Sequence, residues 1–256
     1  FNLAFTPFMV GLAILLPVGS VIPWKRARVA PTVKRLVPVM VVCLAVAGLA
    51  YAVQTGQSLI GPIGVALGVW LVTGVLVELW QRSAGHIARL FRLPRADWGK
   101  ALAHAGLGIT FIGVAGLTAW QQEDIVALAP GEATSVGHYT VTLQSVDDIT
   151  GPNYVSTMAT LTVQRDGQGP VFTLTPERRY YPVAAMPTTE AAIRNAVIDD
   201  VYIVIGDQQS DGRWAIRSFI KPFANWIWFG CILMALGGIV SLTDRRYRIA
   251  AGARRA

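Results

Sequence analysis

The stretch Lys100–Trp120, KALAHAGLGITFIGVAGLTAW, is an almost unbroken run of apolar residues. As an α-helix, about 20 residues cover roughly 30 Å, which is the thickness of the hydrocarbon core of a bilayer. Between Ala101 and Trp120 only one side chain can ionise, that of His104. An ionisable group inside a membrane helix is costly to bury and is usually functional. His104 is therefore the first candidate for a functional residue.

Small residues surround this histidine. Ala101 and Gly108 lie three and four residues from His104, so they share its helical face. A flat metal macrocycle would need an imidazole flanked by residues without bulk. The alternative is a packing histidine, hydrogen-bonded to a neighbouring helix, with the glycines allowing close contact between helices. The residues alone leave both interpretations open.

Composition favours a membrane protein with an additional polar region. The 256 residues are 53% hydrophobic and 14% charged, which is too apolar for a soluble domain. The net charge of +7 comes from basic residues beside the apolar runs, a pattern that argues against nucleic-acid binding. Cys43 and Cys231 both lie in apolar runs, so no disulfide is expected. The chain begins at Phe1 within an apolar run, and we expect it to be a truncated piece of a longer protein.

Apolar segments long enough to span a bilayer occur five times. The segments that separate or follow them alternate between basic and neutral or acidic. By the positive-inside rule, the basic segments are cytoplasmic. The predicted spans are Leu3–Ile22, Leu36–Gln54, Leu59–Trp80, Lys100–Trp120 and Phe223–Leu242.

This pattern predicts three parts. Residues 1–120 would form four transmembrane helices with cytoplasmic loops, and residues 121–221 would lie on the opposite side of the membrane. Residues 222–256 would form the last span and a basic cytoplasmic tail. In the third loop, a short amphipathic helix is expected around Ile87–Phe91. Glu78 precedes Arg82 by one helical turn, which favours a local ion pair over a proton relay.

Residues 121–221 have the alternation and turn signals of strands, which predicts a small β-barrel or sandwich. A hairpin turn is expected at Arg165-Asp166-Gly167, and Thr188–Glu190 has the pattern of a helix N-terminus. The predicted strands are Tyr139–Leu143, Asn153–Gln164, Val171–Leu174, Val201–Ile205 and Arg213–Ile220.

Two adjacent arginines in this region, Arg178 and Arg179, are further candidates. Guanidinium groups bind carboxylates through two parallel hydrogen bonds, so they could hold haem propionates or an acidic partner. The alternative is ion pairing with the acids of the same domain. The sequence contains no phosphate-binding glycine loop, no H-E-x-x-H, no C-x-x-C pair and no G-x-S-x-G motif.

Several unusual strings occur together in order along the whole chain. They resemble the C-terminal part of the CcmF family, the haem lyases of bacterial cytochrome c maturation, whose close relative NrfE is specific for nitrite reductase. The strings are LAHAGLGITFIGV (102–114), LAPGE (128–132), GPNY (151–154), PERRYYP (176–182), MPTTEAAI (186–193), KPFANWIWFG (221–230) and LGGIVSLTDRRYR (236–248).

The resemblance implies a multi-pass protein of the bacterial inner membrane with residues 121–221 in the periplasm. It implies a transmembrane haem b held by two histidines on different helices, and His104, in its A-H-x-G context, matches one of these axial ligands. Haem is also the substrate, delivered by the haem chaperone CcmE, while CcmH presents the apocytochrome c. Ala101 and Gly108 would face the haem b, and Arg178 and Arg179 stay candidates for contacts with haem propionates or with an acidic partner.

The family's tryptophan-rich periplasmic segment and its other haem histidines are absent from this chain, so they are expected upstream or on another chain. The chain would then be one portion of a haem lyase, without a complete active site. The alternative functions are a membrane-anchored docking module for apocytochrome c or CcmH, and a transporter subunit. The transporter is disfavoured because the spans contain few charged residues.

Overall fold

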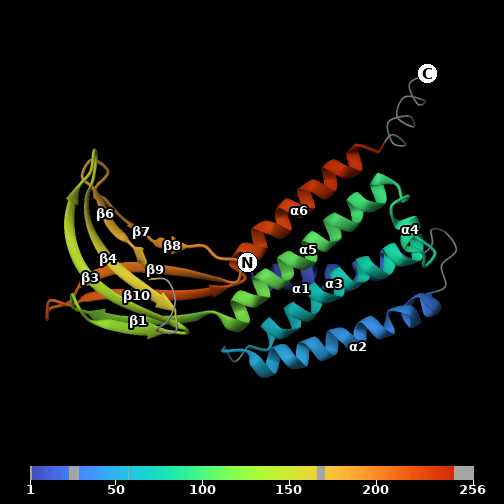
Figure 1. Ribbon diagram of the computed structural model, residues 1–256, viewed down its shortest axis with the longest axis horizontal. Coiled ribbons are helices and arrows are strands. Elements are labelled where there is room, and N and C mark those ends of the chain that lie inside the picture. Colours follow the sequence, from blue (N-terminus) through green and yellow to red (C-terminus); the bar gives the residue numbers. More distant parts are fainter. Residues whose placement is uncertain (1, 23–28, 57, 166–170, 245–256) are drawn as a thin grey trace, which may run out of the picture. The chain divides into compact units, whose positions relative to one another are not determined.

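The computed structural model describes residues 2–22, 29–56, 58–165 and 171–244, and the chain divides into two compact units. The helical unit comprises residues 1–119 and 223–256, and the β domain comprises residues 120–222 (Figure 1). The β domain is therefore inserted between two helices of the helical unit. This is the predicted fold class: five apolar helices with one β-rich insertion.

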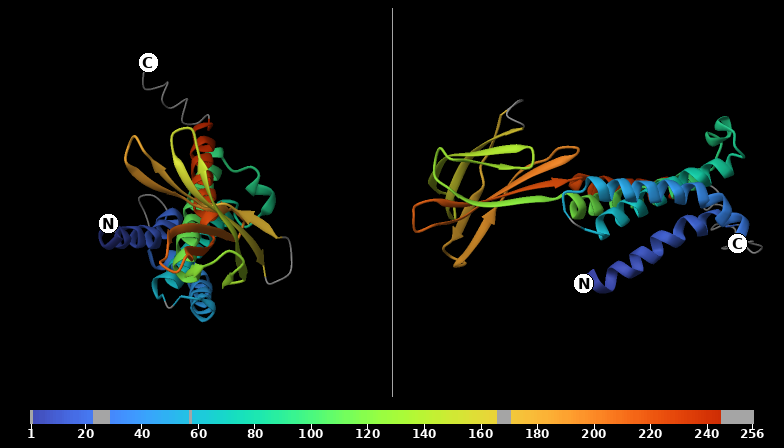
Figure 2. Two further views of the ribbon diagram at one scale, coloured as in Figure 1. Left: turned by 90° about the vertical axis from the view of Figure 1, so that its left-hand side faces the viewer. Right: turned by 90° about the horizontal axis from the view of Figure 1, so that it is seen from below.

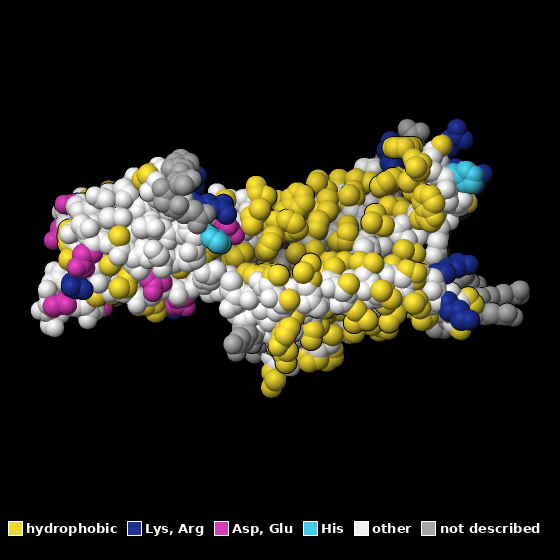
Figure 3. All heavy atoms as spheres, turned by 60° about the horizontal axis from the view of Figure 1, so that its bottom comes forward, with side chains coloured by type: hydrophobic (Ala, Val, Ile, Leu, Met, Phe, Trp, Pro, Cys, Tyr) yellow, Lys and Arg dark blue, Asp and Glu magenta, His cyan; other side chains and the backbone are white. Residues whose placement is uncertain are grey.

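Helices long and apolar enough to cross a membrane number five within the described residues. Hydrophobic side chains cover the outside of the helical unit, and Lys and Arg gather at one end of it (Figure 3). The expected amphipathic helix is a single turn, α4 (Ile87–Leu90). Residues 23–28 and 245–256, which hold part of the predicted basic segments, lie outside the described residues. The five helices are α1 (Asn2–Val21), α2 (Val29–Val53), α3 (Ile60–Arg82), α5 (Arg95–Trp120) and α6 (Ala224–Leu242).

Two rows of small residues on opposite sides of α5 let it pack closely between α3 and α6. A Cβ added to Gly106 would lie 2.6 Å from the carbonyl oxygen of Gly230 in α6. A Cβ added to Gly108 would lie 2.8 Å from the carbonyl oxygen of Gly68 in α3. Such close backbone approach is how membrane helices associate without a hydrophobic driving force. The row toward α6 is Gly99, Gly106 and Gly113, and the row toward α3 is Ala101, Gly108 and Ala115.

Two antiparallel sheets form the β domain, and their strands curl (Figures 1 and 2). Sheet A has the order β1-β10-β9-β8, with β1 (Gln122–Leu128), β8 (Ala192–Arg194), β9 (Asp199–Gln208) and β10 (Trp214–Pro222). Sheet B has the order β2-β3-β4-β6-β7, and β5 pairs with β4. Its strands are β2 (Ala133–Val136), β3 (Tyr139–Thr150), β4 (Val155–Arg165), β5 (Phe172–Leu174), β6 (Glu177–Tyr181) and β7 (Met186–Glu190).

The core of this domain consists of aliphatic side chains from alternate positions of both sheets. Leu143 and Leu161 from sheet B are fully buried together with Ile203 and Ile216 from sheet A. Because successive side chains of a strand point to opposite faces, the alternating sequences place one face in this core and the other in solvent. The predicted β-sandwich is thereby confirmed.

Local details differ from the sequence-based expectation. Thr188–Glu190 does not begin a helix but lies in β7, because Arg178 and Arg179 of β6 pair with Thr189 and Thr188. Threonine is β-branched and suits a paired strand better than a helix interior. β3 continues to Thr150, where the prediction ended at Leu143, because its pairing with β4 resumes after an irregularity at Leu143/Ser145. The predicted Asp-Gly turn lies outside the described residues.

Candidate functional site

His104 is a residue of α5, which packs against both α3 and α6. Its Nδ1 atom is buried and has no hydrogen-bond partner among the described residues. Buried polar atoms of folded proteins nearly always have a partner, so this exception requires an explanation. The expected alternative, a hydrogen bond to a neighbouring helix, is not found in the part of the chain that the structure describes. A partner for the His104 imidazole would therefore have to come from outside the described residues.

Ala101 and Gly108, the two small residues predicted to face a haem, lie against α3. Ala101 packs with Val75 and Leu79 of α3, and the backbone of Gly108 approaches that of Gly68. The space beside these residues is therefore filled by a helix of the same chain. Close helix contact, the alternative role expected for the glycines, accounts for both positions, and we restrict the haem hypothesis to His104.

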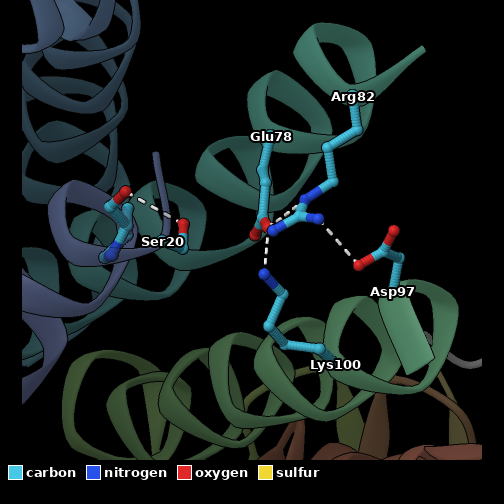
Figure 4. Close-up of polar contacts among 6 residues, drawn as sticks. Ser20, Glu78, Arg82, Asp97 and Lys100 are labelled. Atoms are coloured by element: carbon cyan, nitrogen blue, oxygen red, sulfur yellow. Dashed lines mark hydrogen bonds and ion pairs between the residues drawn. The ribbon is translucent and has the colours of Figure 1, made fainter. Parts of the chain in front are cut away.

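A cluster of charged side chains joins α3 to α5 one turn before His104 (Figure 4). Glu78, only 4% exposed, accepts a hydrogen bond from the Nε of Arg82 at 2.8 Å and forms an ion pair with Lys100. Arg82 also donates through Nη1 to the Oδ1 of Asp97 at 2.8 Å. The predicted ion pair between Glu78 and Arg82 is confirmed. The buried carboxylate of Glu78 is thus paired with two cations, Arg82 and Lys100.

Replacing Glu78 with glutamine is expected to destabilise the helical unit by about 3 kcal/mol, because it leaves Lys100 without its carboxylate and removes one of the two acidic partners of Arg82. The measurement is the thermal unfolding midpoint of the detergent-solubilised full-length protein. Asp97→Asn is the matched control. In this variant Arg82 still pairs with Glu78, and the more exposed ion pair between Arg82 and Asp97 contributes less to stability. Equal shifts for the two variants would contradict this assignment.

Arg178 and Arg179 in β6 are already engaged with acids of the β domain. Arg178 forms an ion pair with Asp207, and the Nε of Arg179 donates to Glu177 at 2.8 Å. This hydrogen bond holds the pKa of the Glu177 carboxyl below its usual value. A haem propionate or an acidic partner would have to displace these carboxylates. Both arginines line a groove of about 500 Å³ on sheet B, next to Ser156 and Tyr180.

Other candidate groups are isolated. No three His, Cys, Asp or Glu side chains gather at a potential metal site within the described ranges. His86 is exposed at the start of α4, with its Nδ1 2.7 Å from the carbonyl oxygen of Ala84. Cys43 and Cys231 are both free thiols, as expected. His104 thus remains the strongest single candidate.

Sequence reasoning missed a contact that fixes the start of α5. Asp244, which follows the end of α6, is 6% exposed, and its Oδ2 accepts the backbone N–H of Ala96 at 3.0 Å. A carboxylate at a helix N-terminus satisfies an unpaired N–H and interacts favourably with the helix dipole. The two residues are 148 positions apart, so no local sequence pattern predicts this contact.

Known proteins resemble this chain in both sequence and fold. Residues 119–222 match the family model described as the CcmF C-terminal beta-sandwich. The chain is 56% identical over all of its length to the cytochrome c-type biogenesis protein Ccl1 of Rhodobacter capsulatus. It is 34% identical over 97% of its length to the cytochrome c-type biogenesis protein CcmF of Escherichia coli. The chain belongs to the CcmF family.

The correspondence is to the C-terminal part of CcmF. The chain spans 39% of the Ccl1 protein and 38% of the Escherichia coli CcmF. A solved structure named Cytochrome c Heme Lyase CcmF is similar in fold, with a TM-score of 0.74 over 95% of this chain and 40% of that one, at 21% sequence identity. The relatives are named cytochrome c-type biogenesis proteins, and this chain combines the β-sandwich of the family model with five helices that are long and apolar enough to cross a membrane.

Proposed function

We propose that this chain is the C-terminal portion of a cytochrome c haem lyase, in which His104 is one axial ligand of a haem b within the membrane. The observation that carries the proposal is the buried Nδ1 of His104 without a hydrogen-bond partner among the described residues. A neutral imidazole in apolar surroundings is a normal haem ligand. The second histidine would come from a helix outside this chain.

Of the residues on this face of α5, His104 is the one that fits such a group, because it is only partly buried, whereas α3 covers Ala101 and Gly108. His104 would hold the iron from one side, and α3 and α6 would keep α5 in a fixed rotation through the two rows of small residues. The haem b, when bound, would supply one-electron redox chemistry, which would keep the substrate haem reduced. The lyase as a whole would join the haem vinyl groups to the two thiols of a C-x-x-C-H apocytochrome, in the bacterial inner membrane with the β domain in the periplasm.

Complementation tests the lyase function. The full-length protein that contains this chain, expressed in a bacterium without its own CcmF, should restore covalently bound haem on a c-type cytochrome, measured by haem-dependent peroxidase staining of denaturing gels. Absence of covalent haem, with the protein present in the membrane at normal level, would refute the proposal.

A docking role for the β domain is the second candidate, favoured by the groove of sheet B that Arg178 and Arg179 line. In that case the domain would bind CcmH, CcmE carrying haem, or apocytochrome c. Deleting residues 121–221 from the full-length protein separates the two functions. Loss of partner binding with haem b retained would assign docking to the β domain, and loss of neither would exclude it.

A further inference from the structure

The loop between β8 and β9 presents apolar side chains to the outside of the β domain. It consists of Asn195, Ala196, Val197 and Ile198 and contains no charged residue. Val197 is 76% exposed and Ile198 is 57% exposed. Two adjacent β-branched side chains on the outside of a domain lose the stabilisation of about 25 cal/mol per Å² that burial would give. Two adjacent exposed apolar side chains are available for contact with an apolar surface, and the place of the loop in the fold decides which surface it can meet.

The strand register places this loop at one particular end of sheet A. Arg194, the last residue of β8, pairs with Val201 of β9, which pairs with Ile220 near the end of β10. Ile220 in turn pairs with Gln122, the first residue of β1. The end of β8 and the start of β9 therefore lie at the same end of the sheet as the start of β1 and the end of β10.

At this same end the chain connects to two membrane helices. One residue, Gln121, separates the end of α5 at Trp120 from the start of β1. One residue, Phe223, separates the end of β10 from the start of α6 at Ala224. A residue of extended chain covers at most about 3.6 Å, so these connections hold this end of sheet A close to the ends of both membrane helices. No equivalent constraint acts on the opposite end of the sheet.

The loop has a defined conformation and amphipathic surroundings. Asp200, 6% exposed, accepts the backbone N–H of Ala196 through Oδ1 at 2.8 Å, which closes the turn that carries Val197 and Ile198. Lys221, which pairs with Asp200 in the ladder, has its Nζ 4.1 Å from the centre of the Tyr202 ring. Lys221 and Tyr202 lie near the same end of sheet A as the loop, and lysine and tyrosine are typical of the region where lipid headgroups meet acyl chains.

We propose that Val197 and Ile198 insert into the interfacial layer of the bilayer, so that the β domain rests on lipid at this end of sheet A. The loop would then be a point of contact with lipid in addition to the two covalent connections to α5 and α6. Apolar side chains at such a contact reach about 5–10 Å into the boundary between headgroups and acyl chains. The proposal concerns the loop and the lipid, and it does not depend on haem binding.

Site-specific labelling tests the contact. The full-length protein is prepared with Val197→Cys or Ile198→Cys in a background without other reactive cysteines, labelled with the fluorophore NBD, and reconstituted in phosphatidylethanolamine–phosphatidylglycerol vesicles. Val183→Cys is the matched control, because Val183 is 100% exposed on the turn between β6 and β7, outside sheet A. Correct folding of each variant is checked by its unfolding midpoint before labelling.

We expect emission from positions 197 and 198 to be shifted to shorter wavelength than emission from position 183. Quenching by nitroxide lipids should be several-fold stronger at 197 and 198, and quenching by aqueous iodide correspondingly weaker. Emission and quenching equal to those at position 183 would overturn the proposal. Protection from both quenchers would also overturn it, because the loop would then be covered by protein instead of lipid.

Discussion

Replacing His104 with alanine is expected to abolish the haem b binding that we propose for the full-length protein. In the proposed site this side chain would supply one of two axial bonds to iron. α5 and its neighbours α3 and α6 hold no other histidine that could replace it, since the chain's other two are His86 and His138. The measurement is the Soret band of the detergent-purified protein per mole of polypeptide. Covalent haem on the target cytochrome should fall in parallel.

Two further variants separate ligation from folding. His86→Ala removes an exposed histidine of the same protein and should leave the Soret band unchanged. His104→Gly creates space for free imidazole, and added imidazole should restore a haem signal in this variant if the ring ligates iron. An unchanged Soret band in His104→Ala would refute the assignment. Loss of haem that imidazole does not restore, together with a lowered unfolding midpoint, would identify His104 as a packing residue.

The sequence predicted the elements whose signals are local. Each membrane span is a long apolar run, and the sandwich core follows from alternation, as in β4, where Leu161 and Val163 are buried. The glycines of α5 were expected to permit close contact, and the seven-residue spacing of Gly99, Gly106 and Gly113 is visible in the sequence. A repeat of seven keeps residues on nearly the same side of a helix, because seven residues are almost two turns.

Features that depend on distant residues could not be predicted. The spacing of Ala101 and Gly108 identifies a face of α5 but does not say whether a haem or a helix occupies it, and the structure places α3 there. Lys100 reaches Glu78 across 22 positions, whereas only the partner of Glu78 on its own helix could be inferred. Thr188 has a local preference that fits a helix N-terminus, but pairing with β6 overrides it.

Replacing Gly237 of α6 with leucine is expected to destabilise the helical unit strongly, whereas the same change at the adjacent Gly238 should not. A Cβ added to Gly237 would lie 2.5 Å from the carbonyl oxygen of Gly99 and 2.6 Å from the backbone nitrogen of Ala103, both in α5. A Cβ added to Gly238 would meet no atom within 4 Å. Gly237→Leu should therefore force α6 away from α5 and cost about 3 kcal/mol. Gly238→Leu should be neutral or slightly stabilising, because leucine is the better helix former.

The comparison is matched, since both variants make the same chemical change in the same helix, one position apart. The thermal unfolding midpoint of the detergent-solubilised full-length protein measures the difference, and Gly237→Ala should already show part of it, because the first added carbon causes the clash. If His104 ligates haem, Gly237→Leu should also lower haem content, because α6 helps to fix the rotation of α5 that aims the imidazole. Equal midpoints for Gly237→Leu and Gly238→Leu would show that α6 does not pack on α5 through this row. Normal haem content in a destabilised Gly237→Leu would show that α3 alone holds His104 in place.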